Sequence, residues 1–363
     1  MSSAPNGLFA YPIVQAPMAG GASCPPLAAA VCEAGGLGFL AGGYKTADGM
    51  YQEIKRLRAL TRRPFGVNLF MPQASHVDPA VLEVYRGHLA SEASWYEISL
   101  ADEDIMGTCD DGYDAKLAIL IEDPVPVVSF TFGLPSPAAF TCLRKVGTYT
   151  IVTVTSVEEA RAAQAAGADA VCVQGVEAGG HQGTHRDDPQ GDGTAGVGLL
   201  ALVAQVREAV ALPIIAAGGL MRGSQIAALL AAGAEAAQLG TAFLACPESG
   251  AHALHKKALT DPLFVRTELT RAFSGRPARG LVNRFMREHG PYAPAAYPQV
   301  HHLTAPLRKA AAAAGDPQGM ALWAGQGHRL ARALPAGELV EVLAAELGAA
   351  QDVLKAMQMR SAS

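Results

Sequence analysis

The sequence predicts an α/β fold in which a closed (β/α)8 barrel carries a smaller lid lobe, inserted or appended after the eighth strand. Eight short apolar runs alternate with alanine-rich stretches, and continuous apolar runs of this length are typical of parallel strands buried on both faces. The phrase "AAGADAVCVQG" at the sixth run also returns as "AAGAEAAQLGT" at the eighth, about two βα units later. Eight such units in succession favour a closed barrel over an open sheet.

The predicted strands begin with "IVQAPM" and end with "AAQLGT"; they cover residues 13–18, 37–43, 65–70, 127–133, 149–155, 170–175, 213–219 and 236–241. The helices between the strands have recognisable ends. Ser156 followed by Glu159 predicts a capping box at the start of the helix after the fifth strand, and Gly167 predicts its end.

Two segments do not fit the βα alternation. Residues 71–126 are too many for one helix, and they include the acidic stretch "ADEDIMGTCDDGYD", which is typical of a solvated surface. Residues 245–330 are interpreted as the lid and substrate lobe. The barrel domain is then residues 1–244 together with a C-terminal helix over about 331–358.

The composition limits the class of protein. The chain has 363 residues, 50% of them hydrophobic, and a net charge of -5, which argues against a nucleic-acid binder. It contains no run of about 18 uncharged apolar residues and no secretory signal pattern at its start, so we expect no membrane segment. The six cysteines form no CxxC pair, which favours reduced thiols in a cytoplasmic protein and predicts no metal site.

A barrel of this kind places its active site at the carboxyl ends of the strands, so the residues there are the candidates. The glycine-rich loops after strands seven and eight contain Gly218, Gly219 and the turn from Gln238 through Leu239 and Gly240 to Thr241. Such paired loops expose backbone N–H groups and bind phosphate groups in many barrels. Simple turn chemistry between a strand and a helix is the alternative.

Two carboxamides, Asn68 and Gln174, end the third and sixth strands. A neutral amide is costly to bury without a partner, and its donor and acceptor edges suit a flat heterocycle such as a flavin. The first strand ends in "QAPMAGG", where Ala16, Pro17 and Met18 offer a fixed backbone and a side chain that can pack on a ring. The alternative is that the amides bond only to each other or to water.

These motifs together resemble the nitronate monooxygenases, or 2-nitropropane dioxygenases, of the FMN-dependent TIM-barrel type. The resemblance rests on "QAPMAGG", "GFLAGGYK", "FGVNLF", "QGVEAGGHQG", "AAGG" and "QLGTAFL", and it covers nearly the whole chain. The chain departs from many members at Arg222, where they carry an acid. The resemblance implies FMN as cofactor, and it implies that Gly179 and Gly180 contact FMN together with the strand-end residues already named.

By the same resemblance, His181 is the catalytic residue. It can hydrogen-bond an anionic nitronate as a cation, or take a proton from a neutral nitroalkane as a base. A hydrogen bond that merely stabilises the loop is the alternative. Gly179, Gly180 and Gly183 would let the backbone approach the flavin ring. Tyr297, His301 and His302 are candidates for the substrate mouth, whereas His185, Arg271, Arg276 and Arg279 are interpreted as structural.

The resemblance implies oxidation of alkyl nitronates by O2 to a carbonyl compound and nitrite, through a flavin semiquinone. A small anion such as propionate 3-nitronate is the expected substrate, detoxification the expected role, and a homodimer is an open possibility. Two alternatives remain. One is an FMN-dependent NAD(P)H oxidoreductase acting on a quinone or an enoyl thioester. The other is a protein that binds a flavin or phosphate ligand without turnover.

Overall fold

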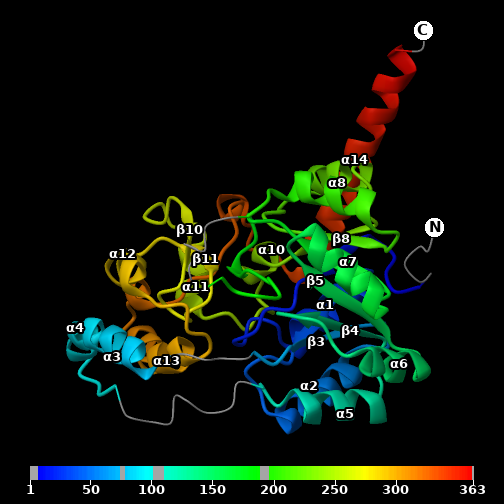
Figure 1. The fold of residues 1–363 in the computed structure, drawn as a ribbon. Coiled ribbons are helices and arrows are strands. Elements are labelled where there is room, and N and C mark those ends of the chain that lie inside the picture. The colour runs from blue at the N-terminus through cyan, green and yellow to red at the C-terminus, as the bar shows by residue number, and fades with distance from the viewer. Residues whose placement is uncertain (1–6, 74–77, 101–109, 189–195, 362–363) are drawn as a thin grey trace.

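The barrel is closed and follows the predicted order of strands. The computed structural model describes residues 7–73, 78–100, 110–188 and 196–361, with side chains described as far as residue 357 (Figure 1). Eight parallel strands run in the order β1-β9-β8-β6-β5-β4-β3-β2, and a parallel bridge between Val14 and Leu37 joins the two ends. The strands are β1 (Ile13–Gln15), β2 (Phe39–Ala41), β3 (Gly66–Phe70), β4 (Val127–Thr131), β5 (Tyr149–Val154), β6 (Ala170–Gln174), β8 (Ile214–Ala217) and β9 (Ala236–Leu239). All eight predicted strands are confirmed.

Helices cover the outside of these strands. They are α1 (Pro25–Glu33), α2 (Ala47–Leu60), α5 (Tyr113–Glu122), α6 (Pro137–Lys145), α7 (Val157–Ala166), α8 (Leu199–Ala209), α9 (Gly223–Ala231) and α14 (Ala336–Ser361). The predicted ends of α7 are confirmed, because the Ser156 side chain accepts from Glu159 N and Gly167 is left-handed with φ +97. In a capping box the Glu159 carboxylate would accept from Ser156 N. It accepts instead from Thr155 N, one residue earlier, at 2.6 Å.

The lid lobe contains a small antiparallel sheet that includes part of the barrel's sixth loop. Its strands are β10 (Thr267–Thr270), β11 (Ala278–Leu281) and β7 (Gly180–His181), in the order β10-β11-β7. The short helix α10 (Thr241–Leu244) follows β9 and precedes the lobe. The lobe's helices are α11 (Ala253–Ala258), α12 (Arg284–His289), α13 (Gln299–Ala313) and the 3-10 turns η1 (Gly290–Tyr292), η2 (Pro317–Gly319) and η3 (His328–Leu330). The sequence indicates only a glycine-rich loop around His181, whereas the structure pairs it with Ala278.

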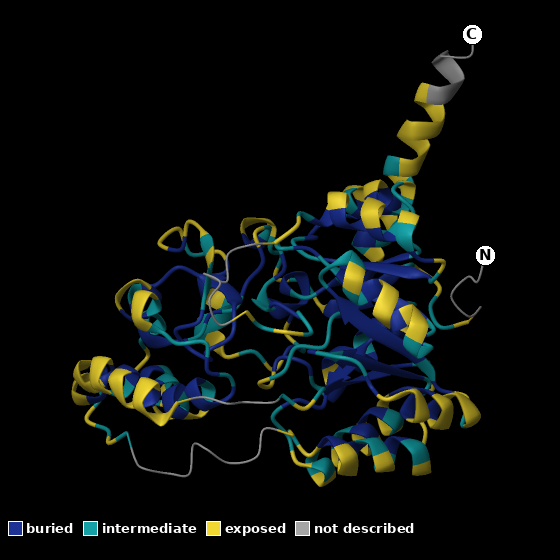
Figure 2. Cartoon of the chain, viewed as in Figure 1, coloured by how far each residue is buried: buried dark blue, intermediate teal, exposed yellow. Residues whose placement is uncertain are grey.

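Two helices from the long segment after β3 pack on this lobe and not on the barrel. They are α3 (Pro79–His88) and α4 (Ala90–Trp95), and Figure 1 shows them beside α13. Tyr85 and Leu89 share a buried cluster with Phe285 and Leu303. Figure 2 shows the buried faces of α3 and α13 turned toward each other. The division between residues 1–244 and 245–330 stays a prediction, and these contacts indicate that the lobe also recruits residues 79–95.

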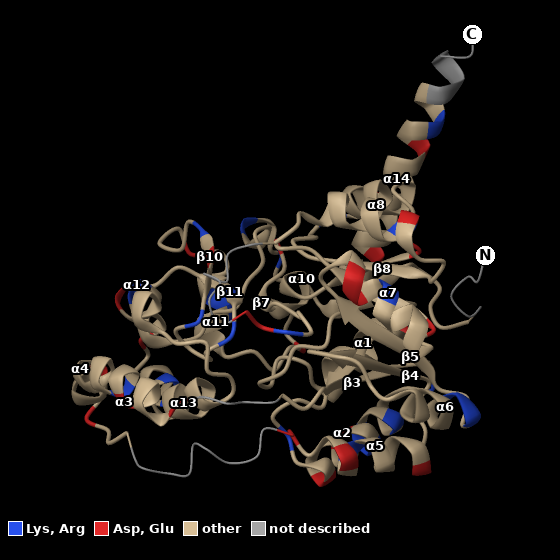
Figure 3. Cartoon of the chain, in the orientation of Figure 1, with Lys and Arg blue, Asp and Glu red and all other residues tan. Residues whose placement is uncertain are grey.

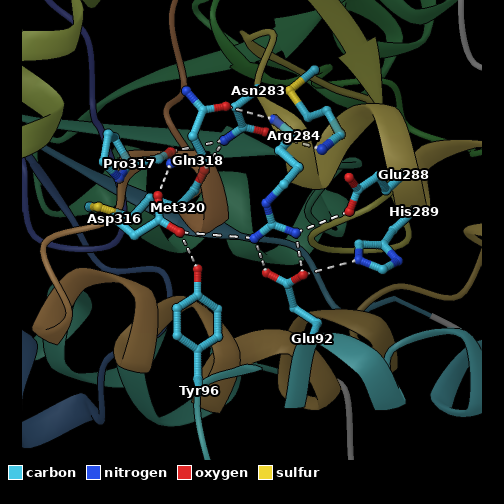
Figure 4. Close-up of polar contacts among 11 residues, drawn as sticks. Glu92, Tyr96, Asn283, Arg284, Glu288, His289, Asp316, Pro317, Gln318 and Met320 are labelled. Atoms are coloured by element: carbon cyan, nitrogen blue, oxygen red, sulfur yellow. Dashed lines mark hydrogen bonds and ion pairs between the residues drawn. The ribbon is translucent and has the colours of Figure 1, made fainter. Parts of the chain in front are cut away.

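A buried ion-pair network fastens α4 to α12 (Figure 4). Both carboxylate oxygens of Glu92, which is 2% exposed, accept from Arg284 at 2.5 and 2.6 Å. His289 Nε2 lies 3.5 Å from the same carboxylate, and Glu288 pairs with Arg284 at 3.0 Å. Glu92, Glu288 and His289 have the spacing of metal ligands. Because Arg284 already occupies both oxygens of Glu92, we interpret the cluster as a structural lock.

The acidic stretch is only partly described, since residues 101–109 lie outside the described residues. Asp111 contradicts the expectation of a solvated surface, because it pairs with the buried Lys116 at 2.7 Å and accepts from Tyr44 N.

Helix α14 packs on α1 and α9, and its end projects from the body as an exposed helix (Figures 1 and 2). Among the described residues, no helix is both long and apolar enough to span a membrane.

Candidate active site

A cavity of about 370 Å³ lies at the carboxyl ends of the barrel strands, where the lid lobe meets them. Every residue that the sequence predicts to hold the cofactor lines it: Ala16, Pro17, Met18, Asn68, Gln174, Gly179, Gly180, Gly218, Gly219, Gln238, Leu239, Gly240 and Thr241. His181 and His301 line it as well. The barrel therefore brings together loops from five of its strands around one space.

Unused backbone donors gather at one end of this cavity. Gly218 and Gly219 have φ +133 and φ +69, values that glycine adopts without strain. Within the described part of the chain, the N–H groups of Gly218, Gly219 and Gly240 donate no hydrogen bond. Such N–H groups, left free after two neighbouring strands, are suited to the oxygens of a phosphate.

The start of helix α9 is not available to an anion, although it follows these glycines. Gln225 Oε1 accepts from the N–H groups of Met221 and Arg222 at 2.7 and 3.0 Å. The Glu346 carboxylate of α14 accepts from Gly223 N at 2.8 Å. Arg222 turns away toward the Leu330 carbonyl. Arg222, which stands where many family members carry an acid, is therefore accommodated by contacts with the C-terminal part of the chain.

The two strand-end carboxamides differ in what they leave free. Asn68 donates to Ser129 and Thr131 at 2.9 to 3.2 Å, while its Oδ1 accepts no hydrogen bond among the described residues. Gln174 bonds to its own loop through both ends of the amide, because its Nε2 donates to His181 O at 3.2 Å and its Oε1 accepts from Gly183 N at 2.7 Å. Gln174 thus shapes the loop that carries His181, and Asn68 keeps an acceptor for a ligand.

His181 is held at the junction of barrel and lid. Its Nε2 lies 2.9 Å from Ser274 Oγ, and its ring lies 5.6 to 5.9 Å from the rings of Trp323, Tyr297 and Phe132. Burial lowers the pKa of His181 to about 3, and the charges of Arg276 and Arg308 act in the same direction. The imidazole is therefore uncharged at neutral pH, which argues against the role of a cation.

Two of the three glycines around His181 do not have the expected role of letting the backbone approach a flavin ring. A Cβ on Gly179 would lie 2.5 Å from Gly325 N, and a Cβ on Gly183 would lie 2.7 Å from the Thr153 methyl group. These two glycines allow close approach of protein to protein. Only Gly180, with φ +73 and open space at its Cβ position, fits the expectation of room for a ligand.

Two aromatic residues of the cavity wall have strained backbones. Tyr44 and Phe132 have φ +63 and φ +75, which is uncommon for bulky residues and concentrates at functional sites. Tyr44 stacks on His301 with ring centroids 4.2 Å apart. Asp111 and Arg276 support the strained residues, the first by accepting from Tyr44 N and the second by stacking on Phe132.

Only one of the three residues predicted for the substrate mouth lines the cavity. His301 lines it from α13, while Tyr297 stands behind the wall, where its hydroxyl donates to Tyr44 at 3.1 Å. His302 is exposed and does not line the cavity, although its ring lies 5.4 Å from the ring of His301. A role for these residues at the substrate mouth stays a prediction.

The residues interpreted as structural make structural contacts. Arg271 forms a two-pronged pair with Asp187 at 2.5 and 2.9 Å, and Arg279 donates to Val176 O at 2.9 Å. Arg276 donates to Gln73 Oε1 at 2.8 Å and to Thr184. Figure 3 shows basic positions, coloured blue, on and beside β11. His185 packs on the barrel, with its Nε2 2.9 Å from Thr153 O.

Several cavity residues are not apparent from the sequence. The lining also contains Tyr44, Phe70, Thr131, Phe132, Cys172, His252, His255, Phe273, Arg308, Met320 and Trp323. Arg308 is a cation on α13, the helix that also carries the predicted site residue His301. A helical face running from His301 to Arg308 is the signal that would have indicated it.

Comparison with known proteins agrees with this geometry. A model of the family described as nitronate monooxygenase matches residues 3–346. The chain belongs to that family. A nitronate monooxygenase of Paraburkholderia phytofirmans is 43% identical over 93% of this chain and 92% of its own length. Family membership confirms the resemblance, identifies the protein as an oxidoreductase enzyme and points to a flavin cofactor.

Two solved structures are similar over the whole length. A nitroalkane oxidase from Streptomyces ansochromogenes is 73% identical, with a TM-score of 0.92, and the alignment covers 96% of this chain and 98% of the other. FabK from Thermotoga maritima is 30% identical, with a TM-score of 0.70 and 96% of both chains covered. The chain therefore shares its TIM-barrel fold with solved structures.

Proposed function

We propose that the protein binds FMN in the cavity and uses it to oxidise nitronates and nitroalkanes with O2. The observation that carries this proposal is the meeting of three features in one cavity. These are the free N–H groups of Gly218, Gly219 and Gly240, the free acceptor of Asn68 and the uncharged His181. Backbone donors would take the phosphate, and the amide acceptor would face the polar edge of the flavin ring.

The residues of the chain divide the remaining work. FMN, when bound, would supply the electron acceptor that O2 reoxidises. Tyr44, Phe132 and Trp323 form an aromatic wall that excludes water from the substrate, which strengthens electrostatic interactions inside. His181 is the candidate for proton removal, since it stands in the same cavity.

Ser274 determines which ring nitrogen of His181 carries the proton. The Ser274 hydroxyl lies 3.2 Å from Arg276 O, to which it donates in this proposal, and it then accepts from His181 Nε2–H at 2.9 Å. His181 Nδ1 is left as the basic nitrogen, and it has no hydrogen-bond partner in the described residues. That nitrogen would take the α-proton of a neutral nitroalkane and turn it into the nitronate.

The substrate class follows from the names of the relatives. The relative of known structure with 73% identity is named a nitroalkane oxidase, and the curated relatives are named nitronate monooxygenases. A small anion such as propionate 3-nitronate suits a cavity of about 370 Å³ that must also hold FMN. The products would be a carbonyl compound and nitrite.

An FMN-dependent NAD(P)H oxidoreductase acting on a quinone or an enoyl thioester is the second candidate. The solved structure titled FabK is similar at 30% identity, which is far below the 73% of the nitroalkane oxidase. The two candidates share a flavin site and differ in the electron donor. A protein that binds flavin without turnover is the third candidate.

The test is to load the purified protein with FMN and measure nitrite release and O2 consumption with propionate 3-nitronate and with nitroethane. The proposal predicts a yellow protein from which heat releases FMN, and nitrite formed in proportion to substrate consumed. A flavin-loaded protein that releases no nitrite from either substrate would overturn the proposed reaction.

A further inference from the structure

Arg308 is a charged side chain at the cavity that no part of the proposed mechanism has used. It lies on α13 about two turns after His301, and it lines the cavity beside Tyr44 and His301. Its Nη2 donates to His301 O at 2.8 Å, and its Nε donates to Thr304 Oγ1 at 3.2 Å. Thr304 in turn donates to Phe273 O at 2.6 Å, so the guanidinium is fixed to its own helix.

In the part of the chain that the structure describes, no carboxylate neutralises Arg308. Among the described residues, its side chain forms no ion pair, whereas Arg271 pairs with Asp187 and Arg284 pairs with Glu92. Burial lowers the pKa of Arg308 to about 10, so it remains a cation at neutral pH. Arg308 is half-buried, and a partly buried charge without a partner at the wall of a cavity points to an anionic ligand as that partner.

The other arginine near this site cannot serve the same purpose. Arg276 stacks on Phe132 with 4.1 Å to the ring centroid, and its nitrogens donate to Gln73, Gln182 and Thr184. It does not line the cavity. Arg308 differs, because its Nη1 donates no hydrogen bond to the described residues.

We infer that Arg308 Nη1 binds the oxygens of the anionic substrate and makes the cavity selective for small anions with a planar pair of oxygens. This inference rests on the proposed function, because a nitronate has that O–N–O group. Nitrite has it as well, and short carboxylates have the corresponding O–C–O group. The planar guanidinium matches such a pair of oxygens better than an ammonium group does.

The experiment measures the binding of nitrite to the FMN-loaded protein, with chloride as the control anion, by titrating the change in flavin absorbance. The wild-type protein is compared with R308M, R308K and K309M. Lys309 is the matched control, because it is an exposed cation next to Arg308 on the same helix. R308M should bind nitrite about 10- to 100-fold more weakly, as expected for the loss of a charge-assisted hydrogen bond. K309M should stay within about twofold of the wild type, because exposed charges are screened.

R308K keeps the charge and loses the planar donor pair, so its affinity for nitrite should lie between those of the wild type and R308M. It also replaces R308M as the informative variant if the latter does not fold. Unchanged nitrite binding in either folded Arg308 variant, or an equal loss in K309M, would overturn the inference. Nitrite binding needs no turnover. A protein that binds nitrite through Arg308 but oxidises no nitronate would therefore contradict the proposed function and leave the inference standing.

Discussion

The Nε2 atom of His181 lies 2.9 Å from the hydroxyl of Ser274, and this contact joins the barrel's catalytic loop to the lid lobe. His181 is at the end of β7, and Ser274 lies in the turn between β10 and β11, the two lid strands that continue the same small sheet. The lid therefore orients the imidazole as well as covering it.

Replacing Ser274 by alanine should slow proton removal while leaving the later oxidation intact. Without the hydroxyl, the position of the ring proton on His181 is no longer set, and the lost hydrogen bond predicts a rate about 5- to 30-fold lower with nitroethane. The rate with ethyl nitronate, which has already lost the proton, should change less than about twofold. Steady-state kinetics with both substrates measure the ratio. Equal losses with both substrates would show that Ser274 has only a structural role.

Replacing His181 by glutamine should abolish most of the activity toward neutral nitroalkanes. A positioned base contributes about 10²- to 10⁴-fold, so kcat with nitroethane should fall by that factor while the FMN content stays near one per chain. The control is H88Q, which changes an exposed histidine that stacks on Tyr292 in the lid lobe. If H181Q and H88Q were equally active, His181 would not be the base.

The protein should lose stability as the pH falls from about 6.5 toward 5. Burial is the first cause that lowers the pKa values of His181, His255 and His301, to about 3, 4 and 2. The unfolded chain therefore binds more protons than the folded chain below the usual histidine pKa, and folding stability rises with pH in this range. Each histidine contributes about 1.4 kcal/mol per pH unit below its ordinary pKa.

Urea unfolding at pH 7.5 and pH 5.5 measures this effect. The variant H255Q should show a shallower dependence than the wild type, because one buried histidine no longer needs a proton on unfolding. Carboxylates titrate mostly below pH 5 and do not disturb the comparison. Identical midpoints for the wild type at the two pH values would refute the account of these neutral histidines.

The Glu92–Arg284 pair should be essential for the lid lobe. Burial raises the pKa of Glu92, but its pairing with Arg284 and His289 outweighs burial and lowers the value to about 2. E92Q removes the two strongest hydrogen bonds of Arg284 and leaves it with Glu288 and Asp316, so it should lower the free energy of unfolding by about 1.5–3 kcal/mol. E288Q changes the exposed partner of Arg284 and should lower it by less than about 1 kcal/mol. Thermal unfolding of the two variants provides the comparison, and similar melting temperatures would contradict the role of the lock.

The barrel could be predicted from the sequence because its signals are local. Each strand is a continuous apolar run, and each glycine after it marks the turn at the carboxyl end, where the cofactor residues lie. The cavity lining by Gly218, Gly219 and Gly240 therefore follows from strand order alone. Helix α7 is a similar case, since Ser156 and Gly167 determine its ends within one stretch of chain.

The lid could not be predicted in the same way, because it depends on contacts between distant residues. His181 becomes a strand residue only through pairing with Ala278, and Gly179 is required by the backbone near Ala324. Arg308 becomes noticeable only in the fold, where no carboxylate of the described residues pairs with it. Contacts between residues so far apart in the chain produce no periodic pattern of apolar residues in the sequence.

The most direct test of the central claim is anaerobic mixing of the FMN-loaded protein with propionate 3-nitronate and, separately, with NADH or NADPH. Flavin absorbance is followed in each case. The account predicts that the nitronate changes the flavin spectrum within the turnover time and that the nicotinamides leave it nearly unchanged. Rapid bleaching of the flavin by NADH or NADPH, with no response to the nitronate, would contradict it and establish the reductase instead.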